Sequence, residues 1–103
     1  MATITNKRLC AGTLSGTEAT LYTTPASTTT IVKSITISNI SAAAVTAFLA
    51  LNDVSVMYGV GLAAGETITI SPFDQIIHAG ETIKGYSDTA SAITYYISGK
   101  EEV

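Results

Sequence analysis

The sequence contains few charged residues: they make up 13 % of its 103 residues, about half of the ~25 % that soluble globular domains usually contain. It has no tryptophan, two prolines and a single cysteine, Cys10. One cysteine excludes a disulfide within the chain and a cysteine-based zinc module. A hydrophobic share of 47 % with a net charge of −3 is too apolar for a disordered chain. The composition is typical of neither collagen nor a coiled coil.

Positive charge is especially scarce, with five Lys and Arg residues against eight Asp and Glu residues. The only adjacent basic pair is Lys7–Arg8, and the three other lysines are scattered along the chain. Binding to nucleic acid needs clustered cations that displace counterions from the phosphates. We therefore expect no nucleic-acid partner.

Hydroxyl-bearing and β-branched residues take the place of charged ones. The chain has 17 threonines and 10 serines, and Val, Ile and Thr together number 35. Such residues favour strands because their branched side chains pack well on a pleated surface. Alternation with a period of two, as in the segment 31–40, indicates a strand with one buried and one exposed face.

The pattern predicts an all-β protein, an antiparallel β-sandwich or jelly roll of about eight short strands, with one domain over residues 1–103. Within it, residues 42–51 suit a strand better than a helix, and residues 54–60 are either a strand or a long excursion. We expect residues 1–6 to form an extended N-terminal arm and residues 100–103 a mobile tail. Besides the open segment 54–60, the expected strands are 7–14, 18–23, 31–40, 42–51, 67–70, 75–78, 81–87 and 92–99.

No segment predicts export or a membrane span. The first residues lack the apolar core of a signal peptide, so we expect synthesis and folding in a cytoplasm. The most apolar window, 42–64, carries Asn52 and Asp53 at its centre, and an aspartate in mid-membrane costs roughly 2.5–3.5 kcal/mol. We therefore expect two buried strands here and no membrane partner.

The residues that usually carry catalysis are isolated from one another. His78 is the only histidine, Cys10 is best explained as a small buried hydrophobe, and the aspartates Asp53, Asp74 and Asp88 fall at expected turns. No spacing suits metal ligands or a phosphate-binding loop. We expect no enzymatic activity, no cofactor and no metal.

Two short patterns are explained by turns. The segment 64–68, Ala-Gly-Glu-Thr-Ile, recurs at 79–83, and each glycine suits a tight turn that leads into a strand. Asn39-Ile40-Ser41 spells a glycosylation acceptor, but without export we interpret it as the turn that ends the strand 31–40.

The shortage of charge favours an interaction surface. Free monomers usually keep charged residues on their faces and sheet edges, whereas the expected outer faces here carry Ser, Thr, Ala and Tyr. We therefore predict a homo-oligomer or a subunit of a larger particle. Tyr58, Tyr86 and Tyr96 are candidate contacts, and a sugar-stacking face is the alternative use of these tyrosines.

Four short stretches occur in a distinctive order: Leu21-Tyr22-Thr23-Thr24-Pro25-Ala26, the strand Thr30–Asn39, Leu62-Ala63-Ala64-Gly65-Glu66-Thr67, and Ala79-Gly80-Glu81-Thr82-Ile83. This order, over roughly residues 20–99, resembles small β-sandwich virion proteins of tailed bacteriophages. One difference is Ser27, where a glycine commonly follows Pro-Ala in that group, so the type of this turn stays open.

The resemblance implies a non-enzymatic structural protein, most usefully a capsid decoration (cement) protein that binds the outer capsid surface and stabilises contacts between capsomers. Its partners would be the major capsid protein and copies of itself in a trimer, on the capsid exterior of a virion. The arm residues Ala2, Thr3, Ile4 and Thr5 would add to a neighbour's sheet edge. The alternative is a tail- or fibre-associated adhesion module that binds host glycan through Tyr58, Tyr86 and Tyr96.

Overall fold

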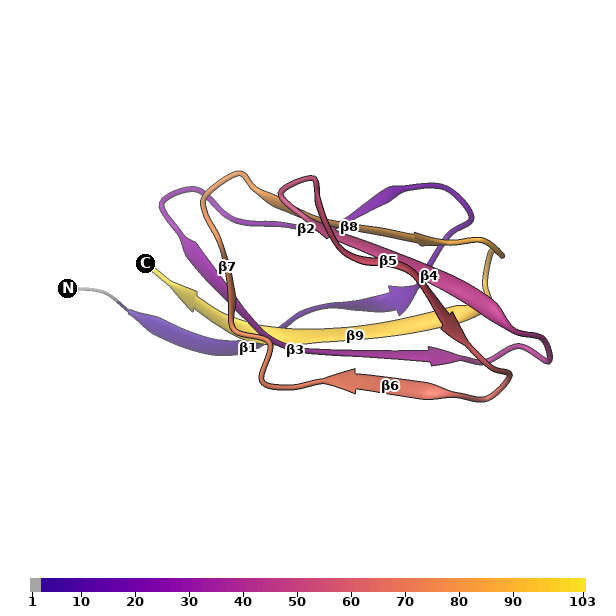
Figure 1. The fold of residues 1–103 in the computed structure, drawn as a ribbon. Helices are drawn as coiled ribbons and strands as arrows, with labels where there is room; N and C mark the ends of the chain where they lie inside the picture. The colour runs from indigo at the N-terminus through magenta and orange to yellow at the C-terminus, as the bar shows by residue number, and fades with distance from the viewer. Residues whose placement is uncertain (1–2) are drawn as a thin grey trace.

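A computed structural model describes residues 3–103, which form nine antiparallel strands (Figure 1). The prediction of an all-β sandwich is confirmed, and the segment left open as strand or excursion is a strand. The described residues contain no helix long and apolar enough to cross a membrane. The strands are β1 (Ile4–Thr13), β2 (Ala19–Thr23), β3 (Thr29–Asn39), β4 (Val45–Leu51), β5 (Val54–Leu62), β6 (Thr67–Ile70), β7 (Gln75–Ile77), β8 (Thr82–Ser87) and β9 (Ile93–Glu102).

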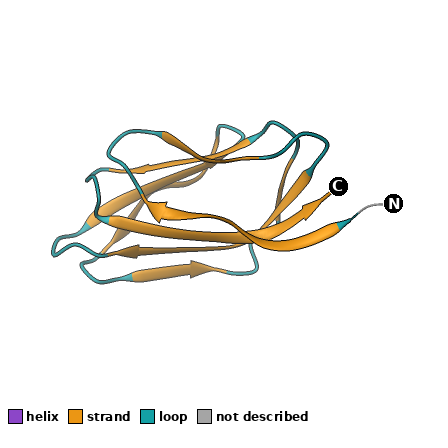
Figure 2. Cartoon of the chain, turned by 180° about the vertical axis from the view of Figure 1, so that it is seen from behind, coloured by secondary structure: helices purple, strands orange, loops and turns teal. Residues whose placement is uncertain are grey.

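The strands form two packed sheets with the nested pairing of a jelly roll. One sheet has the order β1-β9-β3-β6, with β7 beside β6 on the same edge of β3, and the other has the order β2-β8-β4-β5. Apart from β7, the first strand therefore pairs with the last, the second with the second last, and so inward to β4 and β5. This is a long hairpin folded over into two layers (Figures 1 and 2).

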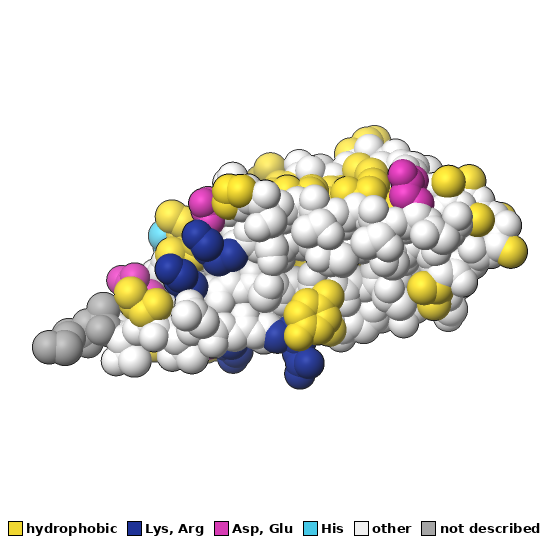
Figure 3. Space-filling model, turned by 90° about the horizontal axis from the view of Figure 1, so that it is seen from below, with side chains coloured by type: hydrophobic (Ala, Val, Ile, Leu, Met, Phe, Trp, Pro, Cys, Tyr) yellow, Lys and Arg dark blue, Asp and Glu magenta, His cyan; other side chains and the backbone are white. Residues whose placement is uncertain are grey.

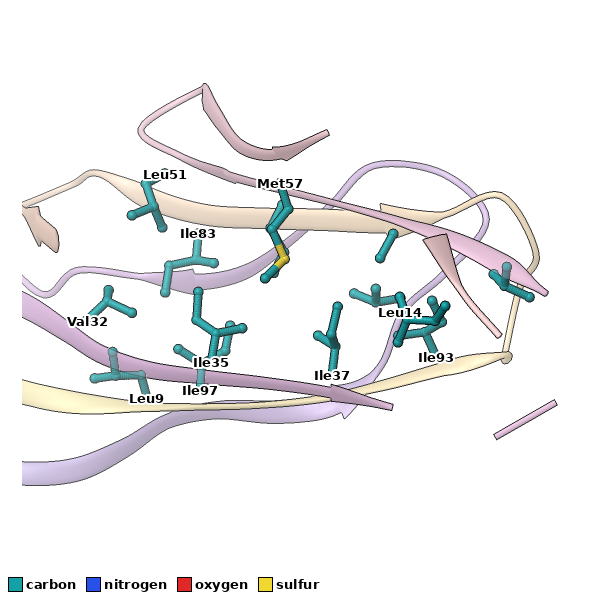
Figure 4. Packing of buried hydrophobic residues seen from close by; sticks show 14 of the residues in the cluster. Leu9, Leu14, Val32, Ile35, Ile37, Leu51, Met57, Ile83, Ile93 and Ile97 are labelled. Atoms are coloured by element: carbon teal, nitrogen blue, oxygen red, sulfur yellow. The ribbon is translucent and has the colours of Figure 1, made fainter. Parts of the chain in front are cut away.

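The core lies between the two sheets and follows from the alternation in the strands (Figure 4). Ile35, Ile37 and Ile97 project from the five-stranded sheet and are fully buried, while Leu49 and Ile83 face them from the four-stranded sheet. Burial of each such side chain stabilises the fold by about 1.5–3 kcal/mol. The alternation that buries these residues necessarily turns their strand neighbours outward, and this positions the surfaces described below.

The first copy of the repeated pentapeptide forms a tight turn before β6. Gly65 has φ 77°, a conformation that glycine adopts without steric cost. The Ala63 N–H donates to Glu66 Oε1 (2.8 Å), and the Glu66 N–H donates back to the Ala63 carbonyl (2.9 Å). The Gly65 N–H donates to the carbonyl of Asn39 at the end of β3 (3.0 Å).

The second copy makes the same bonds before β8. Gly80 has φ 81°, the His78 N–H donates to Glu81 Oε1 (2.7 Å), and the Gly80 N–H donates to the Thr24 carbonyl after β2 (3.0 Å). The two copies therefore play equivalent parts in the two sheets, and the interpretation of the repeat as two similar turns is confirmed.

Asn39 is a structural residue of the core edge and is only 1 % exposed. Its amide Nδ2 donates to the carbonyls of Ala43 (2.7 Å) and Leu62 (3.0 Å). Its Oδ1 accepts from the N–H of Ser41 (2.9 Å). The interpretation of Asn39-Ile40-Ser41 as a turn is confirmed, because this side chain holds the chain reversal between β3 and β4.

Both predictions for the termini need correction. The expected mobile tail at 100–103 is wrong, because Lys100 to Glu102 complete β9 and pair with β1 on one side and β3 on the other. The expected extended arm is not a separate element in its described part, because residues 4–6 begin β1 and pair with the same end of β9. Thr3 and Val103 exchange two backbone hydrogen bonds (3.0 and 2.9 Å). The two ends lack apolar alternation, but each supplies the backbone partners of the other.

Two turns show why particular residues occur in them. Asn52 and Asp53, between β4 and β5, have φ 49° and 62°, as a two-residue hairpin turn requires. Ser27, where a glycine commonly follows Pro-Ala in the resembled virion proteins, has φ 57°. This is the left-handed conformation, which glycine adopts readily and other residues adopt uncommonly.

Candidate interaction surfaces

The outer face of the five-stranded sheet presents a regular array of hydroxyl groups, which we call the hydroxyl face. Pairing places outward residues of four strands in rows across the sheet. In the view onto this sheet from below, the middle of the face is largely free of charged side chains (Figure 3). The rows are Thr13–Thr94–Ser38–Thr67, Ala11–Tyr96–Thr36–Thr69 and Arg8–Ser98–Ser34.

Neighbouring hydroxyls on this face lie within hydrogen-bond distance of one another. The Ser38 and Thr67 hydroxyls are 2.6 Å apart, and those of Ser34 and Ser98 are 2.9 Å apart. With the Thr36 and Thr69 hydroxyls, which are 3.3 Å apart, six of the eight Ser and Thr hydroxyls in the three rows have a partner within the sheet. Burial of unpaired polar groups makes a polar face costly to desolvate, so these pairs lower the cost of covering this face relative to a face of unpaired hydroxyls.

Tyr96 stands at the middle of the hydroxyl face and is 50 % exposed. The guanidinium carbon of Arg8 lies 5.8 Å from the centre of its ring, a cation–π distance. Arg8 is the only charged residue in the three rows. Tyrosine and arginine are enriched among the residues that dominate protein–protein binding energies, and here they adjoin each other within an uncharged field.

The outer face of the four-stranded sheet carries a cluster of aromatic rings instead. Phe48 of β4 pairs with Tyr86 of β8, and their rings stack with centroids 4.5 Å apart and an interplanar angle of 5°. Tyr58 of β5 meets Phe48 edge-on, with centroids 5.4 Å apart and an angle of 85°. Tyr58 is 80 % exposed, so its ring rises from the sheet beside the stacked pair.

These rings border a hollow of about 230 Å³, which we call the aromatic pocket. Polar side chains from Glu18, Ser55 and Lys84 share its lining, and Lys84 Nζ lies 2.9 Å from Asp53 Oδ1. The hydrogen bond to the Asp53 carboxylate and its charge raise the pKa of the Lys84 ammonium. The pocket thus combines aromatic walls with hydrogen-bond donors and acceptors. Its lining is Glu18, Phe48, Leu49, Ala50, Ser55, Tyr58, Lys84, Gly85 and Tyr86.

The structure separates the three tyrosines proposed as contacts. Tyr58 and Tyr86 meet at the aromatic pocket, whereas Tyr96 lies on the outer face of the other sheet. A single sugar-stacking face made of all three is therefore excluded. The tyrosines instead belong to two separate surfaces, because β8 and β9 lie in different sheets.

Of the proposed arm residues, Ala2 lies outside the described residues. Thr3 bonds Val103, while Ile4 and Thr5 pair with Glu102 and Glu101. Ile4 is 59 % exposed, and β1 is an edge strand whose other side has no partner within the described chain. Their part in an interface stays a prediction.

The groups considered for catalysis lie in unremarkable surroundings. Cys10 packs against the core, and burial raises the pKa of its thiol to about 11, so it is protonated at neutral pH. His78 is exposed in the turn before β8. No group of three or more His, Cys, Asp or Glu in residues 3–103 is placed to hold a metal ion.

Phe48 is the main residue of the aromatic pocket that was not predicted from the sequence. Alternation of Val45, Ala47 and Leu49 toward the core already implies that Phe48 faces outward. What the sequence does not reveal is the register that sets Phe48 opposite Tyr86, or the placement of Tyr58 beside both.

Comparison with known proteins adds no identification: no protein-family model matches the chain, and no curated protein matches it. The resemblance to virion proteins therefore remains a prediction from sequence motifs.

Proposed function

We propose that this protein is a non-enzymatic structural subunit of a bacteriophage virion, most specifically a capsid decoration protein that binds the outer capsid surface through its hydroxyl face. The observation that carries the proposal is the uncharged grid of paired hydroxyls around Tyr96 and Arg8. The sequence resemblance supplies the phage context.

The chemistry of the hydroxyl face suits repeated, modest contacts. Its Ser and Thr side chains are short and lose little conformational freedom on burial, unlike Lys or Glu. Tyr96 and Arg8 supply the larger contacts that usually provide most of the binding energy. Each copy needs only moderate affinity, because an oligomer that bridges several capsomers gains strength through avidity.

Self-association is part of the proposal, with a trimer as the expected state. A trimer would present three hydroxyl faces around one axis and could contact three capsomers at once. Sedimentation equilibrium of the purified chain tests this, and a stable monomer at high concentration would contradict it.

The main experiment uses empty, expanded capsids of the phage that encodes the chain, prepared without it. We expect the protein to co-sediment with these capsids and to raise the temperature at which they break. Tyr96→Ala should weaken binding at least tenfold, because it removes the large side chain at the middle of the hydroxyl face.

Tyr58→Ala is the matched control, because it removes an exposed tyrosine from the opposite sheet. It should bind capsids as the unaltered protein does, and thermal unfolding of both variants checks that each is folded. Failure of the unaltered protein to bind capsids, or equal loss in both variants, would overturn the proposed role of the hydroxyl face.

A further inference from the structure

We propose that the aromatic pocket binds a neutral pyranose ring, such as one hexose unit of a polysaccharide. This site lies on the opposite sheet from the hydroxyl face and does not depend on the proposed capsid role. The protein would therefore have two faces with different partners.

The walls of the pocket suit the flat, hydrogen-lined side of a sugar ring. Aliphatic C–H groups of a pyranose carry a small positive charge and pack against the negative face of an aromatic ring. Tyr58 stands 80 % exposed next to the stacked Phe48 and Tyr86. A ligand can thus cover Tyr58 without disturbing the core, and the sheet beneath holds the other two rings in place.

The remaining lining suits the hydroxyls of the sugar. Glu18 offers carboxylate acceptors, Ser55 offers a hydroxyl that both donates and accepts, and Lys84 offers an ammonium donor. Each sugar hydroxyl is both a donor and an acceptor, so the several hydroxyls of one sugar can form hydrogen bonds with all three side chains. The hollow of about 230 Å³ is smaller than the ~300–1,000 Å³ of most drug-sized sites, which fits one ring rather than an extended ligand.

The charges around the pocket favour a neutral sugar over an acidic one. Lys84 is paired with Asp53 at 2.9 Å, and Glu18 adds a second carboxylate to the lining. Two acids against one base leave this region with a net negative charge. A uronic or sialic acid would be repelled, whereas an uncharged hexose would not.

The test is an NMR titration of the ¹⁵N-labelled full chain. The probes are the methyl pyranosides of glucose, galactose, mannose and N-acetylglucosamine, the corresponding glucose and mannose tetrasaccharides, and methyl glucuronide. We expect at least one neutral probe to shift the amide signals of Phe48, Tyr58 and the residues 84–86 at millimolar concentration. If a tetrasaccharide binds more tightly than the methyl pyranoside of the same sugar, the ligand is a polysaccharide. If the two bind with equal affinity, the ligand is a single sugar unit. Both outcomes support a sugar site in the aromatic pocket.

Two variants make the result specific. Tyr58→Ala should weaken binding of the best neutral probe at least tenfold, while Tyr96→Ala, an exposed tyrosine on the other sheet, should leave it unchanged. Glu18→Gln should reduce the difference in affinity between the neutral sugars and methyl glucuronide, because it removes one of the negative charges that repel the glucuronide.

Several outcomes would overturn the site. They are the absence of shifts with every neutral probe, shifts confined to the hydroxyl face, tighter binding of methyl glucuronide, or equal affinity in Tyr58→Ala. A pocket that instead receives a second copy of the chain would show concentration-dependent shifts without sugar. Loss of sugar binding leaves the capsid experiment untouched, so failure of this inference and failure of the proposed function are distinguishable.

Discussion

The two sheets of this jelly roll are alike on the inside and different on the outside. Facing the core, both present aliphatic side chains, and both receive a strand after the same turn with the same hydrogen bonds. Facing solvent, one carries paired hydroxyls around Tyr96 and the other carries three aromatic rings around a hollow. The shared core constrains the inner residues of both sheets to similar chemistry, whereas the outer residues, which the core does not touch, are free to specialise.

The inner faces differ in how closely the neighbouring strand approaches a glycine, and substitution of these glycines has the largest expected effect on stability. A Cβ atom on Gly99 of β9 would lie 2.1 Å from the carbonyl oxygen of Ile31, which is backbone in the neighbouring strand β3. A Cβ atom on Gly85 of β8 would lie 2.6 Å from the end of the Leu49 side chain, which can rotate. We expect Gly99→Ala to lower the free energy of unfolding by about 3 kcal/mol or more, and Gly85→Ala by about 1–2 kcal/mol.

Urea unfolding followed by circular dichroism measures both changes. If Gly99→Ala fails to fold, its Gly85→Ala counterpart should still give a complete two-state transition. Equal costs for the two substitutions would show that the five-stranded sheet is not the more tightly packed of the two.

A hydrogen bond between the sheets gives the next largest effect. The Tyr22 hydroxyl from β2 donates to the Glu101 carboxylate from β9, which Lys7 also contacts at 3.3 Å. Burial, and then the bond to Glu101, raise the pKa of Tyr22 to about 12 from about 10. The protonated phenol is therefore favoured in the folded state. The resulting stabilisation is complete below about pH 10 and is lost as the pH rises toward 12.

We expect Tyr22→Phe to lower the free energy of unfolding by about 1.5 kcal/mol at pH 7, because it removes a hydrogen bond to a charged group. This difference between the two proteins should shrink between pH 10 and 12. The measurement is chemical unfolding of both proteins at a series of pH values. Cys10, whose pKa is about 11, titrates in both proteins, and its thiolate is the smallest of the contributions to the raised pKa of Tyr22. A cost that stayed constant up to pH 12 would contradict the role given to the Tyr22 proton.

The repeated turns give the smallest expected effect and test the likeness of the two sheets. Glu66→Ala and Glu81→Ala each remove a carboxylate that accepts an N–H bond, from Ala63 and His78 respectively. Because both bonds are exposed to solvent, we expect each substitution to cost about 1 kcal/mol. The two costs should agree within about 0.5 kcal/mol.

The matched controls are Glu66→Gln and Glu81→Gln, which keep an acceptor oxygen and should recover most of the loss. Thermal unfolding of the four variants provides the comparison. A large cost at one turn and none at the other would show that the turns share a conformation without sharing an energetic role.

Much of the fold followed from local patterns. The period of two in the segment 31–40 predicted one buried and one exposed face, and the structure confirms it in β3, where Ile35 and Ile37 are buried and Ser34 and Thr36 are not. In β2, a bulge between Thr20 and Tyr22 interrupts the register with β8. Such a bulge arises from pairing with β8, and a strand's own sequence carries no sign of it.

The candidate surfaces were less predictable because each draws on strands far apart in the chain. Tyr58 and Tyr86 could be named as candidates, but not their assembly with Phe48 and Glu18 into one pocket. The termini show the same limit: residues 4–6 and 100–102 look like loose ends locally, and become strands only because each meets the other.

The sequence by itself determined that this chain folds into strands, which side of most strands faces the core, and that its surface carries hydroxyls where charges are usual. Those properties depend on side-chain branching and on a period of two, both of which are local. Only the tertiary structure decided which outward residues stand side by side, and so created a hydroxyl face on one sheet and an aromatic pocket on the other. Strand order and register decide this, because they depend on backbone pairing between residues far apart in the chain, such as Ile4 and Glu102, which are 98 positions apart.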